Sequence, residues 1–285
     1  MYCTYYGCSN LTGSPVCGEK VTDMYYTYYN CTNLTGSPIC GENVINMAMT
    51  YYNCQNLTGS PVCEKNVTDM REAYYNCRNL TGSPACGENV INMPDTYYNC
   101  INISGSPVCG NNVVDMGTTY YNCRNLTGSP VCGKNVTDMG GAYSGCRNLT
   151  GSPVCGDNVV NMSSVYRGCS NLTGSPVCGK NVTDMYCTYY ECRNLYGNAY
   201  FYSPNISNAQ GCFYQRNTKN ILSIYVPANS MTMETLLRNN SQSIISGNVI
   251  WTDDIATNGC YYSRSQNIYI YPVENVAATR EANGD

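Results

Sequence analysis

The sequence has no histidine, and its charged residues make up only 12% of the chain, with a net charge of −4. Without histidine it lacks the commonest acid–base catalyst and metal ligand. It also contains no nucleophile elbow and no Gly-rich phosphate loop. We therefore expect a protein that is not an enzyme and uses no cofactor. Nucleic-acid binding needs a stripe of Lys and Arg, so a nucleic-acid partner is not expected either.

Long apolar runs are missing as well. No stretch approaches the length that spans a bilayer. The start of the chain, Met1 to Cys8, has neither the basic nor the apolar region of a secretory signal. The sequence therefore predicts no membrane span and shows no signal peptide.

What the chain does contain is a 23-residue repeat, which is the signature of a solenoid or a repeat array. The repeat is marked by two columns of cysteines and one of methionines, each advancing by 23 residues. The first cysteine column runs from Cys8 to Cys192, the second from Cys17 to Cys178, and the methionine column from Met24 to Met185. These columns predict about eight and a half coils over residues 1–195.

Tyrosine dominates the aromatic residues, with 29 copies. The tyrosine three positions before the first cysteine never changes between copies, so we expect it to lie in the core. The tyrosine that follows it is replaced by Ser144 and Arg167 in two copies. This second column, which includes Tyr52, Tyr75, Tyr98 and Tyr121, is therefore expected to form an exposed outer stripe.

Two further invariant positions indicate turns. The glycine after Leu-Thr, as in Gly128, suggests a positive φ or a close backbone approach. The asparagine two positions after the first cysteine, as in Asn125, is expected to bond to backbone groups.

The 21 cysteines allow three interpretations. Stacked at one point of each coil, they can form a ladder of buried free thiols, which behave as small apolar groups. Disulfides between successive coils are a second possibility. A metal site is a third, although the chain lacks the CxxC pairs typical of zinc ligands.

The pattern Tyr-x-x-Cys-x-Asn-Leu-Thr-x-x-x-Val, followed by Val-x-x-Met, resembles the BspA-like (Treponema-type) leucine-rich repeats over residues 1–195. It differs in having tyrosine where the family usually has phenylalanine, and Ser-Pro where the family often has Ile-Thr. The resemblance implies a leucine-rich-repeat-like stack in which Leu-Thr-Gly-Ser-Pro-Val-Cys forms a short parallel sheet. The repeated prolines, Pro15 to Pro176, conflict with that assignment because proline removes a hydrogen-bond donor from the ladder.

The repeat decays after residue 195, and residues 196–285 are expected to form a small α+β capping region. Its sequence predicts strands at 221–226, 246–252 and 267–271 and a helix at 231–238. Residues 267–280 are similar to the ends of leucine-rich-repeat proteins of gut bacteria and their phages.

The resemblance implies adhesion and surface binding, at an extracellular surface or on a virion. We expect recognition of a protein or a cell-surface glycan through the outer tyrosines together with nearby arginines, a combination enriched in binding hot spots. The candidate binding residues are Tyr52, Tyr75, Tyr98, Tyr121, Arg78, Arg124 and Arg147. The alternative is a structural subunit of a virion or filament, which would dock, or assemble with itself, through an uncapped N-terminal coil.

Overall fold

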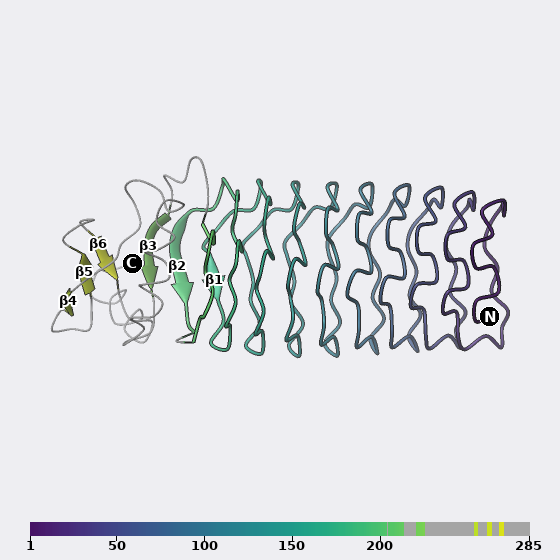
Figure 1. The fold of residues 1–285 in the computed structure, drawn as a ribbon, viewed down its shortest axis with the longest axis horizontal. Helices are drawn as coiled ribbons and strands as arrows, with labels where there is room; N and C mark the ends of the chain where they lie inside the picture. The colour runs from purple at the N-terminus through teal and green to yellow at the C-terminus, as the bar shows by residue number, and fades with distance from the viewer. Residues whose placement is uncertain (204, 214–220, 226–253, 256–260, 264–267, 271–285) are drawn as a thin grey trace.

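The computed structural model describes residues 1–203, 205–213, 221–225, 254–255, 261–263 and 268–270. Its main feature is a row of stacked coils, which begins at the N-terminus and advances regularly along the long axis (Figure 1). Parallel bridges join the same point of successive coils, from Asp23 and Asn46 through Asp184 and Asn208. The 23-residue period therefore corresponds to one coil of a repeat stack.

Among the described residues, regular secondary structure is sparse and lies toward the C-terminus. A parallel sheet has the order β1 (Val177–Cys178), β2 (Gly197–Phe201), β3 (Ile221–Tyr225). An antiparallel sheet has the order β4 (Asp254–Ile255), β5 (Tyr261–Ser263), β6 (Ile268–Ile270). Strands β3 and β6 confirm two of the expected strands, and no helix occurs among the described residues. The expected helix at 231–238 and the expected strand at 246–252 lie outside them.

The core is built from the repeated columns. The invariant tyrosines Tyr51, Tyr74, Tyr97 and Tyr120 are fully buried, as the sequence predicted. Four other columns of the same coils are buried with them: the first cysteines, the leucines (Ile103 in one coil), the valines three residues before each methionine, and the methionines. Each core ring is stacked nearly parallel on the next, with 5.5 Å between the centroids of Tyr51 and Tyr74. The core is therefore continuous along the stack, which no single coil could achieve.

The expectation of a sheet at Leu-Thr-Gly-Ser-Pro-Val-Cys is wrong for most coils. Only β1 occupies that segment as a strand. In the coils before it, most coil-to-coil backbone bonds lie in the turns around the tyrosines. The Tyr28 N–H, for example, donates to the Thr50 carbonyl at 2.9 Å, while the Thr27 N–H closes a turn onto Met24. In these coils, the segment after proline therefore has no ladder of backbone hydrogen bonds to the same segment of the next coil.

The core tyrosine hydroxyl replaces that ladder. The Tyr120 hydroxyl donates to the Val108 carbonyl at 2.7 Å and accepts from the Val108 N–H at 3.1 Å. The same pair of hydrogen bonds, to the backbone of the residue after proline, recurs for every core tyrosine from Tyr28 to Tyr189. A buried backbone group without a partner is costly. This requirement explains why the chain uses tyrosine and tolerates proline here.

The expectation for the invariant glycine is confirmed. Its φ lies between 78° and 85° in all nine copies, Gly13 to Gly197. In seven of these copies, a Cβ would also overlap the serine hydroxyl of the preceding coil, as for Gly128 against Ser106. The asparagine two positions after the first cysteine was misjudged. Its side chain is exposed in every copy, and no hydrogen bond joins it to the backbone within the described part of the chain.

The stack continues through residue 213. Phe213 lies on Tyr189 with 5.5 Å between ring centroids, and the Tyr189 N–H donates to the Cys212 carbonyl. The division of the chain at residue 195 stays a prediction.

Candidate binding face

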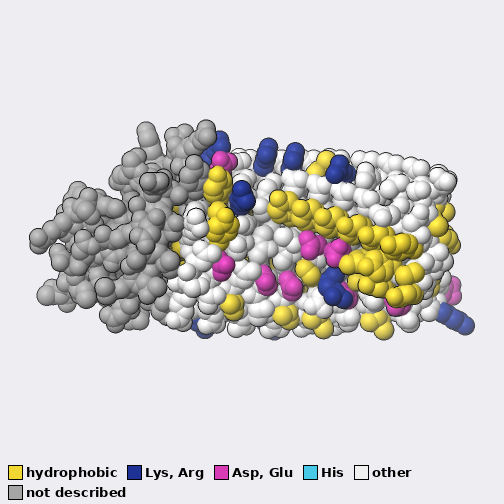
Figure 2. Space-filling model, in the orientation of Figure 1, with side chains coloured by type: hydrophobic (Ala, Val, Ile, Leu, Met, Phe, Trp, Pro, Cys, Tyr) yellow, Lys and Arg dark blue, Asp and Glu magenta, His cyan; other side chains and the backbone are white. Residues whose placement is uncertain are grey.

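The outer tyrosines form a second column of rings on the surface, which we call the outer tyrosine stack: Tyr6, Tyr29, Tyr52, Tyr75, Tyr98 and Tyr121. Neighbouring rings lie 4.5–4.8 Å apart between centroids and are within 12° of parallel. Figure 2 shows them as a continuous stripe that broadens near the N-terminal end. The structure therefore brings together all four tyrosines of the predicted site.

The exposure of these rings differs from the expectation. Tyr52, Tyr75, Tyr98 and Tyr121 are half-buried, because each ring covers the face of the next. Burial raises the pKa of the Tyr75 hydroxyl to about 12, and it raises the pKa of Tyr52 and Tyr98 in the same direction. The hydroxyls of these three tyrosines are therefore protonated at neutral pH and can both donate and accept hydrogen bonds.

An asparagine ladder supports the stack from the next position along the chain. Asn30, Asn53, Asn76, Asn99 and Asn122 all have φ between 57° and 59°. Each amide from Asn53 onward donates to the side-chain oxygen of the asparagine one coil earlier, at 2.6–2.9 Å. Asparagine tolerates this left-handed conformation better than most residues. Asparagine stands directly before five successive cysteines of the first column, Cys31 to Cys123. This run was the signal for the ladder, which was not predicted from the sequence.

The predicted arginines lie beside this ladder. The Nε of Arg78 donates to Asn76 and that of Arg124 donates to Asn122, each at 2.8 Å. Arg147 is exposed too, but two residues before it stands Gly145, which has no side chain to accept such a bond. The three arginines therefore share one edge of the tyrosine face, and Arg147 differs in its attachment.

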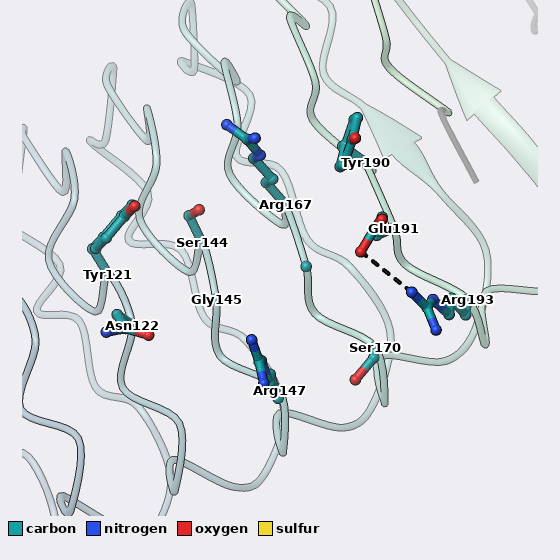
Figure 3. Close-up of a pocket in the computed structure, with 11 residues that line it drawn as sticks. Tyr121, Asn122, Ser144, Gly145, Arg147, Arg167, Ser170, Tyr190, Glu191 and Arg193 are labelled. Carbon is teal, nitrogen blue, oxygen red and sulfur yellow. Dashed lines mark hydrogen bonds and ion pairs between the residues drawn. The ribbon is translucent and has the colours of Figure 1, made fainter. Parts of the chain in front are cut away.

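The outer tyrosine stack is interrupted after Tyr121. Ser144 and Arg167 occupy the next two positions, and Tyr190 resumes the aromatic column. A hollow of about 710 Å³ opens at the interruption. Its lining includes Tyr121, Ser144, Arg147, Arg167, Tyr190 and Arg193 (Figure 3). The Arg167 guanidinium carbon lies 5.0 Å from the centre of the Tyr190 ring, and Arg193 pairs with Glu191 at 3.4 Å.

In the sequence, this interruption indicated only that the column faces outward. Ser144, Arg167, Tyr190 and Glu191 were not predicted as site residues. A break in a column of identical residues was the available signal, since only a side chain outside the core can be lost without a cavity.

Acidic residues flank the other side of the stripe (Figure 2). Burial raises the pKa of the Glu72 and Asp95 carboxyls, and Asp95 accepts a 2.6 Å bond from the Thr118 hydroxyl. The neighbouring column of aspartates and asparagines caps turns: Asp115, for example, accepts the Gly117 N–H at 2.7 Å. These contacts identify Asp115 and its equivalents as turn residues.

The cysteines of the described residues are free thiols. Those of the first column from Cys31 to Cys192 donate to a backbone carbonyl one coil earlier, as Cys100 does to Tyr74 at 3.0 Å. Burial raises the pKa of Cys100 to about 12. In the part of the chain that the structure describes, no cluster of three or more Cys, Asp or Glu is arranged to hold a metal ion.

No helix long and apolar enough to cross a membrane is found within the described ranges. No protein-family model matches the chain, and comparison with curated proteins and with solved structures gives no match either.

Proposed function

We propose that the chain is a non-enzymatic recognition module that binds a protein or a cell-surface glycan through the outer tyrosine stack and its adjoining arginines. The observation that supports this proposal most strongly is the stack itself. Six tyrosines whose side chains are not needed in the core are held in register on one face. Aromatic residues and arginine are the types most enriched at binding hot spots.

The rigidity of the face also suits recognition. Stacked rings and the asparagine ladder fix the side chains before any ligand arrives, so little conformational entropy is lost on binding. The protonated hydroxyls supply donors along one line, and Arg78, Arg124 and Arg147 supply positive charge along its edge. We further propose that the stack is a BspA-like leucine-rich repeat and that it acts at an extracellular surface or on a virion.

The test is a glycan array and a pull-down from surface proteins with the purified chain. The variant Tyr75→Ser/Tyr98→Ser removes two rings and uses the residue that the chain itself carries at position 144. We expect this variant to lose the partner that the wild type captures. Ile91→Ser is the matched control, because Ile91 is an exposed apolar side chain outside the stack. Unchanged capture by the tyrosine variant would refute the proposal.

A structural role is the second candidate, supported by the first coil. Tyr2, Tyr6 and Val16 are between 55% and 62% exposed. Tyr2, Tyr25 and Tyr26 widen the aromatic patch there, with ring centroids 4.2–5.4 Å apart. If this coil docks on a neighbour, the wild type will form larger assemblies in sedimentation and Tyr2→Ser/Tyr6→Ser will not. A wild type that sediments as a monomer would remove this candidate.

A further inference from the structure

The interruption of the outer tyrosine stack leaves one position in the column without a planar group. Tyr121 ends the stack on one side. On the other side, the Arg167 guanidinium lies over Tyr190 at 5.0 Å and so prolongs the column by one planar group. Ser144 lies between Tyr121 and Arg167 (Figure 3). In order along the column, the Tyr121 ring is therefore followed by the empty position at Ser144, then by the Arg167 guanidinium and the Tyr190 ring.

The regular spacing of the column predicts that the empty position has room for one aromatic ring. Rings elsewhere in the column lie 4.5–4.8 Å apart, and a guanidinium lies 5.0 Å from the ring it covers. Successive coils at strand spacing are separated by about 4.8 Å. A flat ring above Ser144 would thus meet Tyr121 on one face and Arg167 on the other, at separations this protein already uses.

Two polar groups in the hollow indicate what the ring should carry. Ser144 is only 6% exposed, and its hydroxyl forms no hydrogen bond with any described residue. Buried polar groups nearly always have a partner. Arg147, which also lines the hollow, lacks the asparagine contact that orients Arg78 and Arg124, because Gly145 stands in that place. Arg193 adds positive charge, although Glu191 offsets part of it at 3.4 Å.

We propose that the hollow at Ser144 binds one planar aromatic ring that bears an acidic group. The ring stacks between Tyr121 and Arg167, and the acidic group meets Arg147 and the Ser144 hydroxyl. This inference rests on the proposed function, since it names the ligand chemistry at one end of the same face. It favours an aromatic acid over a sugar, because a puckered saturated ring does not stack flat between two planar groups.

The experiment titrates the full chain with phenyl phosphate and follows binding by calorimetry and by NMR. Three probes separate the contributions: cyclohexyl phosphate has the charge without a planar ring, phenol has the ring without the charge, and inorganic phosphate has only the anion. We expect phenyl phosphate to bind at least about ten-fold more tightly than each of them, since losing either a charged hydrogen bond or a stacked ring costs on the order of 1.4 kcal/mol or more. Equal binding of cyclohexyl phosphate or inorganic phosphate would overturn the proposal.

The decisive variant is Ser144→Tyr, which fills the empty position with the residue that seven other coils carry there. It should abolish phenyl phosphate binding without lowering the melting temperature. If it fails to fold, Arg147→Gln replaces it, with an expected loss of about ten-fold. Wild-type affinity in a folded Ser144→Tyr variant, or in Arg147→Gln, would overturn the proposal.

The matched control moves the empty position. Tyr52→Ser in the Ser144→Tyr background opens a one-ring gap between Tyr29 and Tyr75, where Gln55 stands in place of the arginine. This variant should not bind phenyl phosphate, and restored binding would contradict the role of the arginines. A short peptide carrying phosphotyrosine distinguishes the sources of the ring: tighter binding than phenyl phosphate indicates a partner's side chain, and equal binding indicates a small aromatic acid.

The two proposals can fail separately. If phenyl phosphate binds and Ser144→Tyr abolishes it, while Tyr75→Ser/Tyr98→Ser still captures the partner, the ring site stands and the wider recognition face does not. If the tyrosine variant loses its partner while phenyl phosphate never binds, only the ring site fails.

Discussion

The middle coils and the last described coil solve the same backbone problem differently. In the middle, the residue after proline bonds to a tyrosine hydroxyl, as Val108 does to Tyr120. In the last coil, the equivalent residue is Tyr200, whose backbone lies in β2 and is paired with β1 and β3. The aromatic residue stacked on Tyr189 there is Phe213, which has no hydroxyl and is fully buried.

This comparison indicates that strand pairing on both sides can take the place of the hydroxyl. Val177, which is paired with β2 on one side, still bonds to the Tyr189 hydroxyl. Where Ser-Pro prevents a ladder, tyrosine is required. Where a strand pairs on both sides, phenylalanine suffices, and Phe201 and Phe213 stack at 5.6 Å. The proline and the tyrosine of each repeat are therefore coupled, since the hydroxyl supplies the hydrogen bonds that the segment after the proline lacks.

The largest effect that separates the two regions should come from alkaline pH. Burial raises the pKa of Tyr51, Tyr97, Tyr120 and the other core tyrosines well above the ordinary value of 10. Above about pH 10, the unfolded chain loses these protons while the folded chain keeps them. Stability is therefore fully present below that pH and falls as pH rises toward the folded pKa values.

We expect cooperative alkaline unfolding in which tyrosinate absorbance and circular dichroism change together. The outer tyrosine stack contributes less, because its pKa values are raised through weaker burial. Tyr120→Phe, which cannot ionise, should make the alkaline transition less steep. Ionisation of all the tyrosines well before any loss of dichroism would contradict the buried column.

A smaller effect should follow from exchanging the two aromatic types. Tyr120→Phe leaves the Val108 N–H and carbonyl without their partner, which costs about 1–3 kcal/mol. Phe213→Tyr places a hydroxyl in a coil whose backbone is already paired, so it should not stabilise the protein. Urea unfolding measures both changes. If Phe213→Tyr stabilised the protein by as much as Tyr120→Phe destabilises it, the claim that strand pairing makes the hydroxyl unnecessary in the last described coil would be wrong.

The smallest effect concerns the thiols, which the two regions share. Cys123 in the middle and Cys212 at the end are both buried, and burial raises the pKa of each. Both should resist labelling by a thiol reagent until the protein unfolds, whereas the exposed Cys8 should react at once. Peptide mapping after labelling of the native protein gives the order in which the cysteines are modified. Early modification of Cys123 would show that the cysteine column is open to solvent.

The repeated columns explain why much of the architecture could be predicted. Core and surface tyrosines were separated because Ser144 and Arg167 replace only the second member of each pair. The position of the sheet was mispredicted because the assignment followed the leucine pattern, whereas the proline in that segment moves the coil-to-coil bonds to the turns around Tyr28 and Asn30. The candidate site was predicted in part, since its tyrosines and arginines recur while its hollow exists where the recurrence stops.

By itself, the sequence determined the 23-residue step, the buried tyrosine and first cysteine columns and the glycine corners. These follow from periodicity and from the steric demands of a positive φ. Only the tertiary structure decided that the outer rings stack on one another, that tyrosine hydroxyls stand in for a sheet, and that a hollow lined by Tyr121, Ser144 and Arg167 opens where the stack is interrupted. The physical reason is that each of these contacts is made between segments 12 or more residues apart, whose spacing is set by the closure of the coil.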